Sequence, residues 1–286
     1  MGGGLGKSPF LFGGELGKSP SPFGGGSGWG LGIHYPDPVL DGSLSLVIPA
    51  HNEAANIGRV IEGCVNTLPR LAVDGEIVLV DDGSTDDTAG VAGRAMEAHG
   101  SRLRIIGHPR KLGYGITVKD GLLAARGDYV AFMDGDGQFD IEDLVTLASH
   151  LDHADLVTGW RRRRADPAYR LVIAGVFNGL VRLLYRVRFR DIDCGLKLMR
   201  RSVLDAAAPL LARSALLNTE LYYKSRRNGF RIVQVPVTHH SRVAGVRSGA
   251  RLIPILRAIR DLMWLRVRLA REWQPRAEVE PVPGSS

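Results

Sequence analysis

The chain has 286 residues, 44% of them hydrophobic, so it can bury the core of one large α/β domain. Its net charge of +7 predicts an anionic partner such as nucleic acid, a phospholipid surface or a phosphorylated substrate. Two cysteines, Cys64 and Cys194, exclude a disulfide framework and predict a reducing, cytoplasmic compartment.

Residues 1–40 are rich in Gly, Ser and Pro and predict a disordered leader, because this composition cannot bury a core. The sequence Leu-Gly-Lys-Ser-Pro occurs twice, at Leu5–Pro9 and Leu16–Pro20. Each copy resembles the end of a phosphate-binding P-loop. Both lack the first glycine and a preceding strand, so we do not assign that function to them.

From Ser43 onward the apolar pattern predicts alternating strands and helices. Predicted strands are Leu44–Ile48, Ile77–Val80, Leu103–Ile106, Tyr129–Met133 and Asp155–Thr158. A helix capped by Asn52 is expected after the first strand. The alternation predicts an α/β fold with a mostly parallel sheet and helices on both faces. Ligands bind beyond the carboxyl ends of such strands, so the loops after Pro49, Val80 and Met133 should meet.

Two carboxylates, Asp134 and Asp136, follow the predicted strand Tyr129–Met133 and are separated only by Gly135. Close anions repel and raise each other's pKa, and a divalent cation relieves that repulsion. Oxygen ligands suit Mg²⁺ or Mn²⁺. The alternative is a polar turn that leads through Asp140 into the next helix. The expected meeting of three loops favours the metal site.

Several segments resemble, in matching order, the family 2 inverting glycosyltransferases of the GT-A fold. They are Ser45–Glu53, Ile77–Asp86 and Asp134–Gln138. Later segments resemble the dolichyl- and polyprenyl-phosphate sugar synthases, namely Asp191–Leu198, Asn218–Leu221 and Val235–Gly245. The resemblance covers about residues 43–250. It implies transfer of a sugar from a nucleotide-diphosphate sugar to a polyprenyl phosphate, with inversion and with Mg²⁺ or Mn²⁺.

The resemblance also implies roles for individual residues on the donor side. Donor-binding residues would be Pro49, Ala50, Asn52, Glu53, Asp81, Asp82, Gly113, Asp134 and Gly135. Metal-binding residues would be Asp134, Asp136 and Gln138. The alternative for Asp81 and Asp82 is a turn followed by a helix cap at Ser84. Gly113 could equally be an ordinary loop glycine.

On the acceptor side the resemblance implies phosphate contacts from Arg161, Arg170 and Arg242. The catalytic residues that the resemblance implies are Asp136, Asp191, Asp193 and Arg242. A lipid phosphate is already a nucleophile at neutral pH and needs positioning rather than a base. A hydroxyl of a glycan, glycolipid or small metabolite would need a general base. Asp191 and Asp193 are the candidates for it, and the alternative is that they anchor the loop.

The expected domain boundaries are a GT-A domain at 41–249, a basic amphipathic helix at 250–274 and a flexible tail at 275–286. The helix can lie on a lipid surface, which predicts a peripheral location on the inner face of the membrane. It can also dock on the domain, a second subunit or a membrane protein. A nucleic-acid-binding protein is the rival class, but no RNA- or DNA-binding signature is present, so no nucleic-acid partner is expected.

Overall fold

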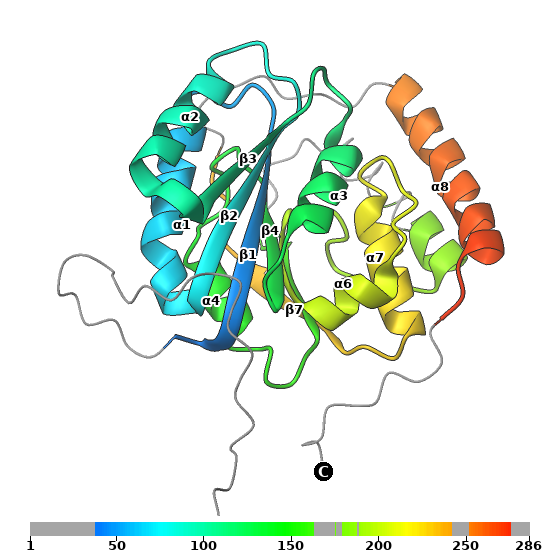
Figure 1. Cartoon of the computed structure of the whole chain (residues 1–286). Helices are drawn as coiled ribbons and strands as arrows, with labels where there is room; N and C mark the ends of the chain where they lie inside the picture. The colour runs from blue at the N-terminus through cyan, green and yellow to red at the C-terminus, as the bar shows by residue number, and fades with distance from the viewer. Residues whose placement is uncertain (1–37, 163–174, 176–178, 188, 242–251, 276–286) are drawn as a thin grey trace, which may run out of the picture. The chain divides into compact units, whose positions relative to one another are not determined.

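The computed structural model describes residues 38–162, 175, 179–187, 189–241 and 252–275 (Figure 1). The backbone alone is described for 252–258. All these residues belong to one compact unit, Tyr35–Ser286. Most of the predicted leader and nearly all of the predicted tail lie outside the described residues. The expected domain boundaries therefore stay a prediction.

The described strands form one seven-stranded sheet in the order β3-β2-β1-β4-β6-β5-β7. Their bounds are β1 Leu40–Ala50, β2 Ala72–Asp81, β3 Leu103–Gly107, β4 Tyr129–Met133, β5 Leu156–Arg161, β6 Leu196–Arg200 and β7 Ile232–Val237. Neighbouring strands are parallel except at β6, which runs antiparallel to both β4 and β5. The mostly parallel sheet is confirmed, and the antiparallel strand inside it was not predicted.

Helices cover both faces of the sheet, as expected. Their bounds are α1 Ile57–Leu71, α2 Thr88–His99, α3 Tyr114–Ala124, α4 Asp143–Ala148, α6 Arg201–Ala207, α7 Leu217–Arg227 and α8 Leu252–Glu272, with a short 3₁₀ turn at Gly100–Arg102. Figure 1 shows α1 and α2 on one side of the sheet and α3, α6 and α7 on the other. Successive residues of β1 face opposite ways, so Leu46 and Ile48 pack in the α1 core while Val47 packs in the α3 core.

Asp128 connects the start of β4 to β1 through two hydrogen bonds. Its Oδ2 accepts one from the Ser43 backbone N at 2.9 Å and another from the Ser43 hydroxyl at 2.7 Å. These bonds from Ser43 lower the pKa of Asp128. They stabilise the ionised carboxylate, so their contribution is complete above the ordinary aspartate pKa of about 3.9 and is lost as pH falls through the lowered value.

We expect Ser43→Ala to lower the free energy of unfolding at pH 7 by about 1 kcal/mol or less, because Asp128 is exposed and solvent screens the bond. The difference from wild type should shrink as pH falls below about 4. Urea unfolding at pH 7 and pH 3 measures it. Ser225→Ala is the control, because its hydroxyl donates to the carbonyl oxygen of Leu221, which does not titrate. An equal difference at both pH values for Ser43→Ala would contradict the assignment.

Candidate donor and metal site

The ends of β1, β2 and β4 are joined by backbone hydrogen bonds. The Asp82 N donates to the Ala50 carbonyl at 2.8 Å, and the Gly135 N donates to the Pro49 carbonyl at 3.2 Å. Because β1 lies between β2 and β4 in the sheet, its last residues bring the two acidic loops to one edge. The structure thus places Pro49, Ala50, Asp82 and Gly135 together, as the sequence predicted.

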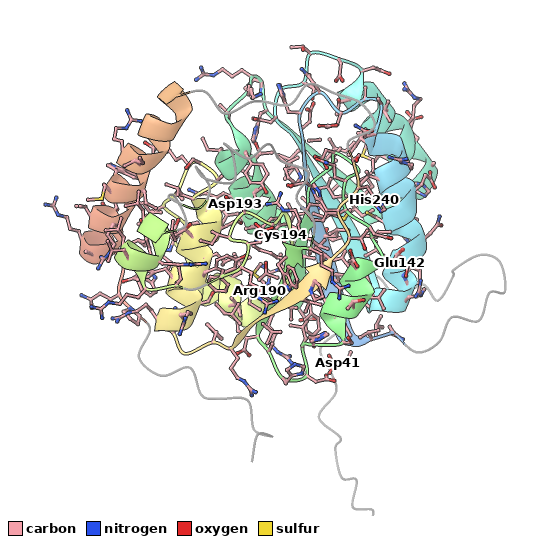
Figure 2. The ribbon with its side chains drawn as sticks, turned by 180° about the vertical axis from the view of Figure 1, so that it is seen from behind. Asp41, Glu142, Arg190, Asp193, Cys194 and His240 are labelled. Carbon is pink, nitrogen blue, oxygen red and sulfur yellow. The ribbon has the colours of Figure 1, made fainter. Side chains whose placement is uncertain are left out.

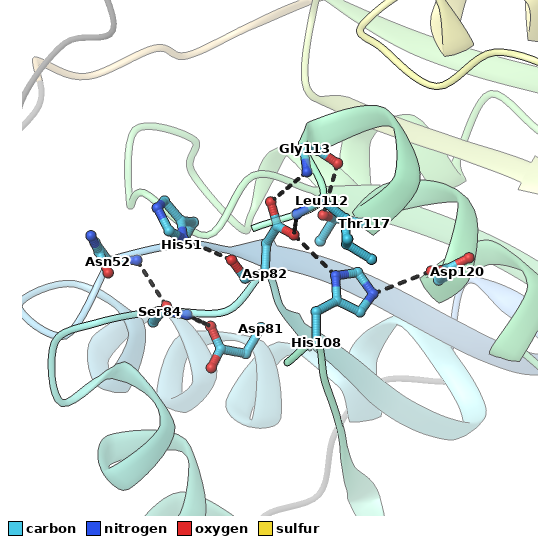
Figure 3. Close-up of polar contacts among 10 residues, drawn as sticks. All are labelled: His51, Asn52, Asp81, Asp82, Ser84, His108, Leu112, Gly113, Thr117 and Asp120. Atoms are coloured by element: carbon cyan, nitrogen blue, oxygen red, sulfur yellow. Dashed lines mark hydrogen bonds and ion pairs between the residues drawn. The ribbon is translucent and has the colours of Figure 1, made fainter. Parts of the chain in front are cut away.

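The loop after β1 is held against the loop after β2 (Figure 3). Asn52 has a positive φ of 56°, its N donates to Ser84 Oγ at 2.9 Å, and its Oδ1 accepts from the Thr85 N at 2.8 Å. The expectation that Asn52 caps a helix is wrong, because α1 begins only at Ile57. Tertiary contact between the loops uses its side chain instead. Glu53 is buried and accepts a hydrogen bond from Asn56 Nδ2 at 2.8 Å.

Asp81 closes the turn that follows β2. Its Oδ1 accepts from the Ser84 N at 3.1 Å and from the Ser84 hydroxyl at 2.5 Å. Within the part of the chain that the structure describes, Oδ2 of Asp81 has no hydrogen bond. The turn expected as an alternative is therefore present, and it leaves one carboxylate oxygen for a donor group of a ligand. The helix cap expected at Ser84 is wrong, because α2 begins only at Thr88.

Asp82 holds the loop 108–113 that leads into α3 (Figure 3). Its carboxylate accepts from the Leu112 N at 2.7 Å and the Gly113 N at 2.9 Å, and contacts His108 Nδ1 at 3.0 Å. Burial opposes ionisation of Asp82, but the contacts with His108, Leu112 and Gly113 outweigh it and lower the pKa. The carboxylate oxygens of Asp82 were expected to contact the donor directly. In the structure they contact loop 108–113 and hold its conformation.

His108 was not identified from the sequence. Its Nε2 lies 3.2 Å from Asp120 Oδ2, so the ring stands between the carboxylates of Asp82 and Asp120. Gly113 is the last residue of this loop and has a φ of 103°, a conformation that residues with a side chain rarely adopt. Gly113 is thus more than an ordinary loop glycine, because it turns the chain into the first residue of α3.

Asp134 is partly buried and its two oxygens have different neighbours. Tyr114 donates its hydroxyl to Oδ1 at 2.9 Å, and Oδ2 lies where a Cβ on Gly195 would be. Burial, followed by the charge of Asp136, raises the pKa of Asp134 to about 7. Only a residue without a side chain fits at position 195 while Asp134 keeps this place. Tyr114 was missed because it lies 20 positions before Asp134, with no local signal of the contact.

Lys197 provides a buried positive charge near this acidic edge. Its side chain is fully buried, donates to the Cys194 carbonyl, and has Nζ 4.6 Å from the centre of the Phe132 ring. Burial lowers the pKa of Lys197 to about 8. The sequence motif contained this lysine, but its burial on β6 depends on the antiparallel strand that was not predicted.

The loop after β4, which holds the expected metal ligands, is tied to the segment before Arg242. Asp136 Oδ1 accepts from the Gln138 N at 3.1 Å, and Gln138 Nε2 donates to the His240 carbonyl at 2.9 Å. The His240 N donates in return to the Gln138 carbonyl at 2.7 Å. Figure 2 shows His240 on the side of α1, where it lines a cavity of about 600 Å³ with Arg59. No group of three or more His, Cys, Asp or Glu side chains that could hold a metal occurs in the described ranges.

On the acceptor side, Arg161 and Asp191 form a bidentate ion pair. Nε and Nη2 of Arg161 lie 2.7 and 2.9 Å from the two oxygens of Asp191, which is 2% exposed. This geometry favours the anchoring role that was left open for Asp191. Asp193 is exposed, on the loop before β6 (Figure 2). Arg170 and Arg242 lie outside the described residues, so their expected phosphate contacts stay predictions.

This fold is shared by known sugar transferases. The chain superposes on glucosyl-3-phosphoglycerate synthase from Mycobacterium tuberculosis, solved with Mn²⁺, UDP and glucosyl-3-phosphoglycerate, with a TM-score of 0.56 and 21% identity over 78% of this chain and 79% of that one. Mannosyl-3-phosphoglycerate synthase from Rubrobacter xylanophilus gives a TM-score of 0.58 and 20% identity over 84% and 78%. The fold class is therefore GT-A, as predicted.

Residues 45–207 match the family described as Glycosyl transferase family 2, and the chain belongs to this family. Dodecaprenyl-phosphate galacturonate synthase from Rhizobium johnstonii is 32% identical over 213 residues, which are 73% of this chain and 62% of that protein. Undecaprenyl-phosphate 4-deoxy-4-formamido-L-arabinose transferase from Sodalis glossinidius is 29% identical over 73% and 63%. The chain thus spans about three fifths of the length of these relatives. The resemblance inferred from the sequence motifs is confirmed.

Proposed function

We propose that this protein transfers a sugar from a nucleotide-diphosphate sugar to a polyprenyl phosphate. The observation that carries the proposal is the junction of the acidic ends of β2 and β4 across β1. It places the carboxylates of Asp81, Asp134 and Asp136 on the edge where ligands bind in such sheets. Relatives named for dodecaprenyl-phosphate and undecaprenyl-phosphate support the choice of acceptor.

The residues present fit a divalent cation. Burial, followed by the charge of Asp136, raises the pKa of Asp134, and a bound cation would relieve the repulsion between the two carboxylates. Mg²⁺ usually takes only one or two protein carboxylates together with substrate phosphates. Asp136, Asp134 and the amide oxygen of Gln138 would hold it. When bound, the cation supplies positive charge for the leaving nucleoside diphosphate.

The rest of the site would position two anionic reactants. Asp82 and His108 hold the loop beside the nucleotide, and Asp81 offers an oxygen to the base or ribose. An oxygen of the lipid phosphate attacks the anomeric carbon as the carbon–oxygen bond to the diphosphate breaks, which inverts that carbon. A phosphate with a second pKa near ~6 needs no general base, in keeping with the pairing of Asp191 to Arg161.

A hydroxyl acceptor is the second candidate, and one observation favours it. Asp193 is exposed on the loop before β6, three positions before Leu196, and a hydroxyl nucleophile needs such a carboxylate within reach as general base. The two candidates differ in their dependence on Asp193. Asp193→Asn would abolish transfer to a hydroxyl and leave transfer to a phosphate largely intact.

A donor screen tests the proposal. UDP- and GDP-sugars are incubated with Mn²⁺ or Mg²⁺, with and without a polyprenyl phosphate, and the released nucleoside diphosphate is measured. Release that requires both the metal and the lipid phosphate supports the proposal. Release that requires a glycan or another alcohol supports the second candidate. If no donor releases nucleoside diphosphate under any of these conditions, and the protein instead binds DNA or RNA in a salt-sensitive way, both candidates are overturned.

The exposed face of α8 supports the further proposal of peripheral membrane contact at the inner face of the cytoplasmic membrane. Leu262, Leu265 and Leu269 are buried against the domain. The opposite face presents Met263, Trp264 and Val267, which are 49%, 43% and 46% exposed, beside Arg260, Arg268 and Arg271. Apolar residues flanked by arginines suit an anionic lipid surface. No helix in the described ranges is long and apolar enough to cross a membrane.

We expect the protein to co-sediment with vesicles that contain anionic phospholipid and much less with neutral vesicles. The double variant Trp264→Ser with Val267→Ser should lower binding at least about tenfold, because each side chain contributes about 1.5 kcal/mol or more when buried in the interface. Val73→Ser removes an apolar residue of β2 that is even more exposed, at 64%, and should bind like wild type. Wild-type binding by the double variant, or a dimer that both substitutions disrupt, would contradict membrane docking.

A further inference from the structure

We propose that Tyr114 is a positioning residue that couples nucleotide binding at loop 108–113 to divalent-cation binding at Asp134 and Asp136. The inference rests on the function proposed above and adds a residue to its site. It concerns how two parts of the donor site, on different strands, are made to act together.

The backbone of Tyr114 is held from both sides. Before it, Asp82 at the end of β2 accepts hydrogen bonds from the Leu112 N at 2.7 Å and the Gly113 N at 2.9 Å. After it, Gly115 lies so close to the backbone of Ser214 that a Cβ at position 115 would overlap it. Tyr114 therefore has little freedom to move unless the loop before it moves too.

The side chain of Tyr114 carries this constraint to β4. Its hydroxyl donates to Asp134 Oδ1 at 2.9 Å, while Gly195 leaves room for Oδ2 on the other side. Since β1 separates β2 from β4 in the sheet, the path from Asp82 through Tyr114 to Asp134 spans a strand. The path consists of one hydrogen bond at each end, from Gly113 to Asp82 and from Tyr114 to Asp134, and of the peptide bond between Gly113 and Tyr114.

This connection has a thermodynamic consequence. A nucleotide that orders loop 108–113 also holds Tyr114, and so selects the orientation of Asp134 that the cation requires. The cation, by ordering Asp134, must improve nucleotide affinity by the same factor, because coupling between two binding sites is reciprocal. Without the Tyr114 hydroxyl, Asp134 is still present after β4 but no longer has the hydrogen bond that links it to the loop.

Titration calorimetry tests the coupling with UDP and with GDP, each with and without Mn²⁺. In wild type, Mn²⁺ should increase the affinity of one nucleotide. Tyr114→Phe should reduce that increase about tenfold, the scale of a hydrogen bond to a charged group. Its affinity for the nucleotide without Mn²⁺ should stay within about twofold of wild type, because Asp82 still holds the loop. Electron paramagnetic resonance of Mn²⁺, which gives the affinity for Mn²⁺ with and without the nucleotide, supplies the reciprocal measurement.

Two further variants separate positioning from general damage. Tyr129→Phe removes a bond of the same kind, from Tyr129 to Asp41 Oδ1 at 2.7 Å, at the other end of β4, and should behave like wild type. In the background of Asp134→Asn, Tyr114→Phe should cause no additional loss of coupling, because its partner has already changed. Urea midpoints within error of wild type show that the variants are folded.

The inference is overturned if Tyr114→Phe keeps the wild-type increase, or if it weakens metal-free nucleotide binding as much as metal-dependent binding. It is also overturned if the loss persists in full in the Asp134→Asn background. These outcomes leave the proposed transferase function standing. Wild-type protein that shows no effect of Mn²⁺ on either nucleotide would overturn both.

Discussion

Asp136→Asn is expected to lower kcat for sugar transfer at least about 10³-fold, because it removes a charge that would hold the cation on the leaving diphosphate. The amide retains an oxygen that can accept the hydrogen bond from the Gln138 N, now 3.1 Å from Asp136 Oδ1. The loop should therefore keep its conformation. Steady-state release of nucleoside diphosphate over a range of Mn²⁺ concentrations measures the effect.

Asp140→Asn is the matched control for this prediction. Asp140 Oδ1 accepts from the Glu142 N at 3.0 Å, the same local bond two residues along the chain, and the change in charge is the same. It should retain transfer within a few-fold of wild type. Metal-dependent transfer by Asp136→Asn at more than a tenth of the wild-type rate would remove Asp136 from the metal site.

The largest expected effect on stability comes from Lys224→Met. Lys224 and Glu220 form an ion pair of 2.7 Å on α7, and both side chains are fully buried. Removing the cation leaves a buried carboxylate with no opposite charge beside it, which costs about 3–5 kcal/mol of unfolding free energy. Urea unfolding monitored by tryptophan fluorescence measures it. Its exposed counterpart is the pair of Arg94 and Asp87, where Arg94→Met should cost less than about 1 kcal/mol.

The double variant Glu220→Gln with Lys224→Met should recover part of this loss. Glutamine is neutral and can still accept hydrogen bonds from Leu211 and Ala212, whose N atoms donate to Glu220 at 2.7–2.9 Å. The loss that remains reflects the carbonyl oxygens of Ala207 and Pro209, which Lys224 now satisfies. A double variant as unstable as Lys224→Met would show that the unpaired charge is not the cause.

Much of the fold could be predicted because its first half is built from local patterns. The apolar strand Tyr129–Met133 and the acidic residues directly after it are adjacent in sequence, so their relation survives any tertiary arrangement. Parallel strands joined by helices also bring their carboxyl ends to one edge. The position of the acidic residues at a strand end and the meeting of the strand ends both follow from residues that are close in the sequence, where the geometry of the chain leaves few alternative arrangements.

The second half could not be predicted in the same way. β6 enters the sheet antiparallel between β4 and β5, and its register sets Lys197 opposite Phe132 of β4. Nothing within Leu196–Arg200 specifies that neighbour, since packing against strands far away in sequence selects the register. The pairing of Arg161 with Asp191 has the same origin, and it favours the anchoring role that was one of the two alternatives for Asp191.

The sequence alone determined the class of fold, the family, and the carboxylates at the strand ends, because each depends on local periodicity or on motifs that are contiguous in the chain. Only the tertiary structure decided which oxygens those carboxylates still offer. The carboxylate of Asp82 accepts a hydrogen bond from a loop residue 30 positions later, and that of Asp134 accepts one from a tyrosine 20 positions earlier. Such contacts arise where separate loops pack together, and hydrogen-bond partners at that distance leave no trace in local residue patterns.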